Sequence, residues 1–181
     1  MRARGVAGAQ LHRSSKSFGR ELTAARRPSK LVPAMTDFDA KNHDWAALVP
    51  EFTVQDIGRS LHFWCNLLGF RTLYERVDVG FAYLQRERAE VMLEQMSRDS
   101  WSVGDLVNPF GRGINFQIAT SSIAPILNRL AAANWPLFVQ PAERWYRTGS
   151  VESGQRQFLV QDPDGYLLRF AEGLGERAVE P

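Results

Sequence analysis

The stretch FLVQDPDGYLLRF, residues 158–170, holds two short β-prone runs on either side of a tight turn. The turn is Asp162-Pro163-Asp164-Gly165, in which proline and glycine supply the backbone geometry that a chain reversal needs. In the second run, Leu168 and Phe170 fall on one side of an extended chain and Arg169 falls on the other. The stretch therefore predicts a turn followed by a strand that packs one face on a core.

The residues before this stretch predict a strand, a helix and another strand. INFQIAT, residues 114–120, is β-prone, and Ser121 or Ser122 can cap the helix that follows. Asn134 can end this helix, because asparagine tolerates a left-handed backbone. Residues 113–173 thus have the order strand, helix and three strands. The apolar stripe of the helix consists of Ile123, Ile126, Leu127, Leu130 and Ala131.

Residues 47–96 repeat this order. LVPEFTV alternates as a strand, Asp56 can cap the following helix, and Gly69 can end it. Three β-prone runs follow, with the sequences RTLYERV, GFAYLQR and AEVMLEQM. Matched helix positions, such as Leu61 and Ala124, lie roughly 63 residues apart, so the chain contains a duplicated βαβββ unit joined by a linker at 97–112. The first helix stripe consists of Ile57, Leu61, Trp64, Leu67 and Leu68.

The N-terminal part of the chain has a different composition. Residues 1–34 contain eight Lys and Arg residues but only one acidic residue, Glu21, whereas the whole chain has a net charge of +2. The remainder is therefore acidic, and the basic pI gives no support for a nucleic-acid partner. We expect residues 1–46 to form a disordered basic extension and lead-in, with Met35 as the true start or, alternatively, with an organelle-targeting segment before it. Residues 174–181 are expected to be a C-terminal tail.

The composition also restricts the class of protein. With 44% apolar residues the chain can bury one core, and no apolar run approaches the roughly 20 residues that cross a bilayer. Its one cysteine, Cys65, has no partner for a disulfide within the chain and is expected to be buried and inert. We therefore expect a single cytoplasmic domain with no membrane partner.

The tandem βαβββ order, with LVPEFTVQD, GFAYLQ, VMLEQM, GINFQI and FLVQDPDGYLLRF in succession, resembles the vicinal-oxygen-chelate (VOC) superfamily, which includes glyoxalases, bleomycin resistance proteins and dioxygenases. It is most similar to the bleomycin resistance branch. The resemblance covers about residues 47–173 and implies an α+β fold, the glyoxalase/bleomycin resistance fold. In that fold the two modules form a cupped mixed β-sheet with the helices on the outer face, and the ligand binds in the cup.

Enzymes of this superfamily hold a divalent metal with four side chains, usually two His and two Glu. The motifs place Val49, Glu94, Asn115 and Arg169 at these four positions. Valine has no lone pair, and a guanidinium is a donor only, so two of the four cannot ligate a metal. We therefore expect no metal, no cofactor and no catalytic residue. The three histidines, His12, His43 and His62, form no recognisable catalytic arrangement, and His62 is expected to face solvent.

Strand alternation predicts which residues line the cup. The residues that share a face with the four family positions are mostly polar, and their neighbours are apolar and should face the helices: Phe52, Val54, Val91, Leu93, Phe116, Ile118, Leu168 and Phe170. Exposed aromatic residues outside the regular strands could stack on a flat ligand. The predicted ligand-binding residues are Glu51, Glu94, Trp101, Asn115, Gln117, Trp145, Tyr146 and Arg169.

Two structural alternatives stay open for these residues. Glu94 and Arg169 could simply pair with each other where the family has its metal. Trp101, Trp145 and Tyr146 could instead bury a dimer interface, and Phe110 is a further linker aromatic. Trp64 is expected in the core, and Trp135 is expected to pack near the end of the second helix.

The resemblance implies a non-catalytic protein that sequesters a glycopeptide antibiotic of the bleomycin class, or a similar cationic ligand, as a homodimer. One alternative is a metal-dependent lyase, isomerase or dioxygenase, which would need unaligned ligands such as His43 with Glu51 and Glu94. Another is a metabolite carrier or sensor without a resistance role. The sequence does not separate the carrier from the sequestering protein, because both need the same cup.

Overall fold

The structure is a computed structural model that describes residues 38–179. The expectations for residues 1–37, including the start at Met35, lie outside the described residues. The described chain contains two four-stranded mixed sheets and two helical segments, one for each module. The predicted tandem βαβββ order and the α+β class are therefore confirmed.

The first module begins with β1 (Glu51–Val54), which leads into α1 (Ile57–Leu61) and a continuing π-helical segment, η1 (His62–Leu67). The strands β2 (Arg71–Arg76), β3 (Phe81–Arg86) and β4 (Ala89–Gln95) follow, with a short 3₁₀ turn, η2 (Val77–Val79), between the first two. The strand order is β1-β4-β3-β2, and β1 runs parallel to β4. This crossover places the first and last strands of the module side by side.

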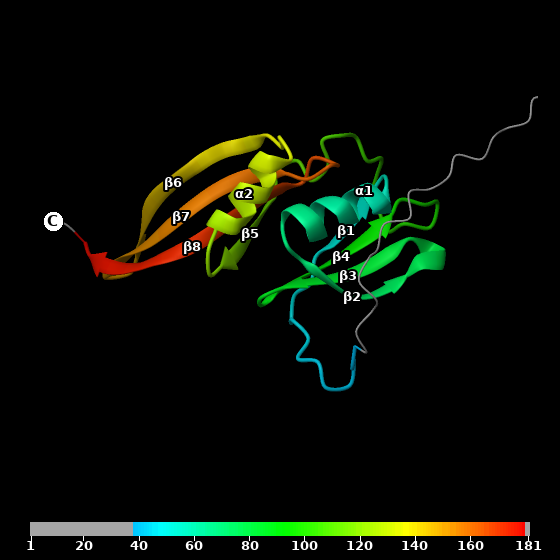
Figure 1. The fold of residues 1–181 in the computed structure, drawn as a ribbon, viewed down its shortest axis with the longest axis horizontal. Helices are drawn as coiled ribbons and strands as arrows, with labels where there is room; N and C mark the ends of the chain where they lie inside the picture. The colour runs from blue at the N-terminus through cyan, green and yellow to red at the C-terminus, as the bar shows by residue number, and fades with distance from the viewer. Residues whose placement is uncertain (1–37, 180–181) are drawn as a thin grey trace, which may run out of the picture. The chain divides into compact units, whose positions relative to one another are not determined.

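The second module repeats this topology. It consists of β5 (Asn115–Thr120), α2 (Ala124–Ala132), β6 (Leu137–Thr148), β7 (Val151–Gln161) and β8 (Leu167–Ala178). The strand order is β5-β8-β7-β6, and β5 runs parallel to β8. In Figure 1, α2 lies against this sheet, and β6, β7 and β8 continue well past the end of the helix.

The helix boundaries follow the capping residues of the sequence. Asp56 is the N-cap of α1, where its carboxylate accepts a hydrogen bond from the Arg59 amide at 3.0 Å, and Gly69 has φ +79° beyond η1. Asn134, with φ 52°, follows α2 as predicted. The N-cap of α2 is Ile123, one residue after the predicted serines, and its amide donates at 2.9 Å to Glu172 of β8.

One apolar core joins the two modules. Phe52 of β1 meets Phe116 of β5 edge to face, with ring centroids 4.6 Å apart, and the hydroxyl of Tyr166 donates to the carbonyl of Thr53 at 3.1 Å. Trp64 is fully buried, and Trp135 packs on Phe63. The residues predicted to face the helices are buried or packed against this core, so the predicted strand faces are confirmed: Phe52, Val54, Val91, Leu93, Phe116, Ile118, Leu168 and Phe170.

The largest departure from prediction is the length of the last three strands. Trp145 and Tyr146 were expected outside regular strands, but both lie in β6, and Gly154 lies in β7. That prediction was wrong, because the segment pairs with β7 over most of its length despite its glycines. β8 likewise continues to Ala178, into the expected C-terminal tail.

Smaller corrections concern the first helix and the linker. Ser60 of α1 and Phe63 of the π-helical segment η1 are buried in addition to the predicted stripe. Phe110, expected as an exposed linker aromatic, is buried, and its amide donates to the carbonyl of Asp164. Cys65 is half-buried rather than fully buried, and burial raises the pKa of its thiol. His62 is exposed, as predicted.

None of the helices between residues 38 and 179 is both long enough and apolar enough to cross a membrane.

Candidate functional site

The first sheet carries two carboxylates on the face that points away from the shared core, which we call the first cup face. Glu51 of β1 and Glu94 of β4 lie on neighbouring parallel strands, in which Thr53 pairs with Glu94 and Glu51 pairs with Met92. Strand alternation therefore places both carboxylates on one face, as diagonal neighbours. Neither forms an ion pair within the described part of the chain.

The two carboxylates influence one another. Partial burial raises the pKa of Glu51, the negative charge of Glu94 raises it further, and Arg76 opposes both effects. Arg76 itself lies over the Phe81 ring, with its guanidinium carbon 3.9 Å from the ring centroid. Two carboxylates and one arginine thus lie in this part of the face, and the excess of negative charge favours a cationic ligand.

The second sheet presents an amide-rich face around an arginine, the second cup face. Gln117 of β5 pairs with Arg169 of β8, and Asn115 pairs with Leu167, so the strands bring all three predicted polar residues to one region. Asn115 and Gln117 are exposed. The Nε of Arg169 is buried and has no hydrogen-bond partner between residues 38 and 179. A buried donor without a partner is costly, so this position favours an acceptor from a ligand or water.

Tyr146 shares the second cup face through its contact with β7. Its hydroxyl accepts a hydrogen bond from the side-chain amide of Gln157 at 2.9 Å. Gln157 pairs with Ala171, two residues beyond Arg169, and Gln155 follows on the same side. The side-chain carbonyl oxygens of Gln155 and Gln157 are buried and lack donors in the described structure. The predicted ligand-binding residues did not include these two glutamines, although Gln157 begins a β-prone run in the sequence.

The other two predicted aromatic residues lie elsewhere. Trp145 precedes Tyr146 on one strand, so the two side chains point to opposite faces of the sheet. Trp145 lies flat over Gly154, and the guanidinium of Arg177 stacks on it at 4.2 Å. Trp101 lies in the linker and is 95% exposed. The described part of the chain therefore does not bring these three rings into contact with one another.

The alternative in which Glu94 pairs with Arg169 is not found among the described residues. The ion pairs among residues 38–179 are His43–Glu90, Arg86–Glu87 and Arg177–Glu152. Because the two residues lie on separate sheets, their charges do not neutralise one another by direct contact.

A polar network that the sequence reasoning missed lies at the other end of the first cup face. Glu90 of β4 is 5% exposed and accepts hydrogen bonds from His43, the Ala46 amide, Tyr83 and Gln85, at 2.7, 3.1, 2.7 and 3.0 Å. Burial raises the pKa of Glu90, but these donors outweigh it and hold the pKa below its ordinary value. Glu90 and Glu94 lie four residues apart on β4, so their side chains share one face of the sheet. Strand alternation could therefore have predicted Glu90 as a residue of the first cup face.

The donor chemistry does not fit the metal that the family resemblance implies. Val49 precedes β1, and Glu94, Asn115 and Arg169 lie on β4, β5 and β8, so two of the four positions offer no lone pair. His43, the unaligned candidate ligand, is bound to Glu90 instead of Glu51 and Glu94. Within residues 38–179, no three His, Cys, Asp or Glu side chains cluster so as to hold a metal ion. No metal-dependent step is derived for these residues.

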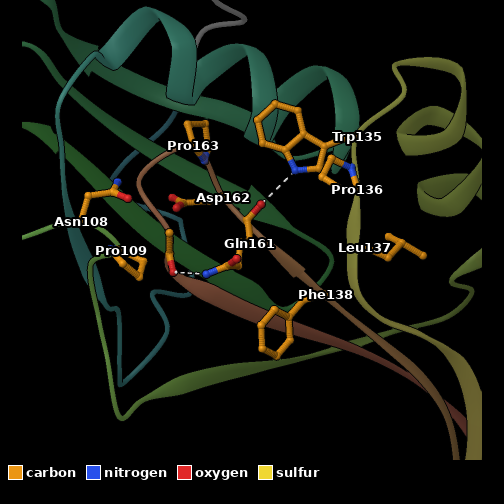
Figure 2. Close-up of a pocket in the computed structure, with 10 residues that line it drawn as sticks. Asn108, Pro109, Trp135, Pro136, Leu137, Phe138, Gln161, Asp162 and Pro163 are labelled. Atoms are coloured by element: carbon orange, nitrogen blue, oxygen red, sulfur yellow. Dashed lines mark hydrogen bonds between the residues drawn. The ribbon is translucent and has the colours of Figure 1, made fainter.

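A separate pocket of about 490 Å³ lies beside the Asp162 turn (Figure 2). Its wall is tied together by the Trp135 indole, which donates to the carbonyl of Gln161, and by the Gln161 side chain, which donates to the carbonyl of Gly165. The lining is mostly apolar, with Pro109, Pro163 and Phe138 among its residues. None of the predicted ligand-binding residues lines this pocket.

Each of the two βαβββ modules thus presents one face of its sheet opposite the helix, and in the first module residues 38–46 cover part of that face. The chain belongs to the Glyoxalase/Bleomycin resistance protein/Dioxygenase superfamily, whose sequence profile matches residues 44–170. It is similar to a bleomycin resistance protein from Geobacillus stearothermophilus, with 28% identity over 135 residues, 70% of this chain and 96% of that protein.

Two solved structures illustrate the range of relatives. A superfamily member from Vibrio splendidus 12B01 is 36% identical, covering 70% of this chain and 97% of its own, with a TM-score of 0.32. TioX from Micromonospora sp. ML1 is 20% identical, covering 71% of this chain and all of its own (100%), with a TM-score of 0.55. The likeness to TioX concerns the fold alone.

Proposed function

We propose that this protein is a non-catalytic binding protein of the bleomycin resistance type, which sequesters a glycopeptide antibiotic or a similar cationic ligand in the cytoplasm as a homodimer. The observation that carries the proposal is the pair Glu51 and Glu94, two neighbouring carboxylates without an ion-pair partner in the described chain. Such a pair attracts a cation, because binding relieves the repulsion between the two charges.

The second cup face supplies complementary chemistry. Arg169, Gln155 and Gln157 each have a buried polar atom without a partner between residues 38 and 179, and Tyr146 adds a ring beside them. Amide and guanidinium groups suit the many amide groups of a glycopeptide. The bleomycin resistance protein at 28% identity supports this class of ligand. Sequestration requires affinity only, so the lack of suitable metal ligands at the family positions is no obstacle.

Calorimetric titration of the full chain with metal-free and copper-loaded bleomycin tests the proposal. We expect saturable binding, and Glu94→Gln should weaken it about tenfold, which corresponds to roughly 1.4 kcal/mol for one lost charge contact. His62→Gln is the matched control, because His62 is exposed on η1 and points away from the first cup face.

Other outcomes point to the alternatives. Binding of a different cationic metabolite, without heat from bleomycin, would favour a carrier or sensor. Stoichiometric metal in the purified protein, found by elemental analysis, would revive the lyase, isomerase or dioxygenase alternative. An absence of saturable bleomycin binding in a correctly folded protein contradicts the proposed sequestration.

A further inference from the structure

Part of the first cup face is covered by the chain itself. Residues 38–46, which we call the N-terminal strap, precede β1 and form no helix or strand of their own. Two polar contacts anchor the strap to Glu90: the His43 imidazole donates at 2.7 Å and the Ala46 amide at 3.1 Å. Both end on a carboxylate that is almost fully buried. The strap therefore places the His43 imidazole and the Ala46 amide on the Glu90 carboxylate of the sheet.

The strap also places aromatic rings over tyrosines of the sheet. Tyr74 and Tyr83 stack side by side on β2 and β3, with centroids 5.3 Å apart. Trp45 stands edge-on to Tyr83 at 5.1 Å, and Phe38 stacks on Tyr74 at 6.0 Å. His43 lies against Trp45 at 4.6 Å, so the imidazole and the indole form one unit. Together they cover a patch of the sheet with two tyrosines and a buried carboxylate, which we call the strap pocket (Tyr74, Tyr83, Gln85 and Glu90).

The strap is held by side-chain contacts and one amide hydrogen bond and forms no strand pairing with the sheet beneath it. Its internal order comes from a turn at Asp39, which accepts hydrogen bonds from the Lys41 amide and the Asn42 side chain. Trp45 remains 41% exposed. A segment with few backbone bonds to the sheet and a partly exposed anchor ring belongs to the parts of a protein that open at low free-energy cost.

We propose that the strap pocket is a second binding site, specific for a small ligand in which a flat aromatic ring carries a cationic group, and that the strap is its built-in competitor. Glu90, which keeps its hydrogen bonds from Tyr83 and Gln85 when the strap leaves, accepts the cation in place of His43. The stacked tyrosines receive the ring in place of Trp45. The apparent affinity is lowered by the fraction of molecules whose strap is closed. The site goes beyond the proposed function, since it requires neither bleomycin nor a dimer.

Tryptamine, an indole with an ammonium group, is the probe for the strap pocket. The double variant His43→Ala/Trp45→Ala removes the two competing side chains and leaves the pocket walls intact. Ligand-observed NMR should show tryptamine binding at least about tenfold more tightly to this variant than to the wild type, because the competitor is gone. Indole-3-acetate, with the opposite charge, should not bind. Val103→Ala is the control, because Val103 is fully exposed in the linker and belongs to neither proposed site.

Tryptamine affinity that is equal in the folded double variant, the wild type and Val103→Ala overturns the proposal. A second measurement covers the case in which the double variant does not fold. In the wild type, hydrogen exchange at the Ala46 amide, which donates to Glu90, should be slow and should accelerate several-fold in excess tryptamine as the strap is displaced. Exchange that excess tryptamine leaves unchanged also overturns it. Neither result depends on whether bleomycin binds, so the two proposals fail separately.

Discussion

Asp162 is a buried carboxyl group whose pKa the fold raises well above its ordinary value. One of its carboxylate oxygens accepts hydrogen bonds from the amides of Asp164 and Tyr166, and the other is buried without a partner in the described structure. Burial, followed by the neighbouring charge of Asp164, raises the pKa of Asp162 to about 6. Asp162 therefore forms the turn at a free-energy cost, because burial disfavours the ionised form of its carboxyl group.

This penalty predicts a pH dependence of stability. The folded protein binds a proton on Asp162 more tightly than the unfolded chain, where the carboxyl titrates near 3.8. Stability from this residue is therefore gained as the pH falls from about 7 to 4, by up to roughly 3 kcal/mol. Relative to Asp162→Asn, the wild type should become more stable over this range in urea unfolding experiments. Asp105→Asn, at an exposed linker position, is the control, and a difference that does not vary with pH contradicts the assignment.

At the scale of single residues, the alternation of side chains along each strand was the most informative feature of the sequence. It placed Glu51, Glu94, Asn115, Gln117 and Arg169 on faces opposite the apolar residues, and the burial of those apolar residues agrees with it. It could not show that His43 bonds to Glu90, because the two residues lie 47 positions apart and nothing in their local sequence pairs them.

At the scale of elements, the long strands β6 to β8 form although β7 contains Gly154, and glycine inside a strand usually weakens it. Gly154 lacks a side chain where the Trp145 ring lies, and a Cβ atom there would come within 2.7 Å of the indole. The glycine therefore lets the ring lie flat on the sheet with Arg177 above it. Gly154 therefore leaves room for the Trp145 ring within the paired strands.

Gly154→Ala should consequently destabilise the protein. The Trp145 ring must move and give up its stack with Arg177, at a cost of about 1 kcal/mol, which lowers the Tm by roughly 2–4 °C in a chain of this length. Gly173→Ala is the matched control, since a Cβ atom there meets nothing within 4 Å. Differential scanning calorimetry provides the measurement, and equal Tm values for the two variants would show that the ring is not confined by the glycine.

At the scale of the whole molecule, one edge strand is exposed on both of its faces. β6 lies at the edge of the second sheet, and Phe138, Val139 and Tyr146 are 58%, 41% and 41% exposed. An exposed apolar edge strand invites pairing with another chain. This supports the homodimer in the proposed function, with the second cup face as part of the contact.

Light scattering after size-exclusion chromatography tests the dimer. The full chain has a mass of 20.5 kDa, and we expect the wild type to have about twice that mass in solution. Val139→Lys/Tyr146→Lys should shift the protein to the monomer, because two charges would then lie on the face proposed for the contact. Val103→Lys, at a fully exposed linker position, should leave the mass unchanged. A monomeric wild type refutes the dimer without refuting ligand binding.

The sequence by itself determined the features that depend on near neighbours. The helix-capping residues Asp56 and Asn134, the turn at Asp162 and the two-residue alternation of the strands act within a few residues, and together they predicted the duplicated βαβββ order. They also excluded two of the four family metal positions by chemistry alone. The tertiary structure decided which faces are covered and how far the strands extend. The strap over Glu90 and the pairing of β6 with β7 and β8 depend on packing between distant segments, for which no local periodicity exists.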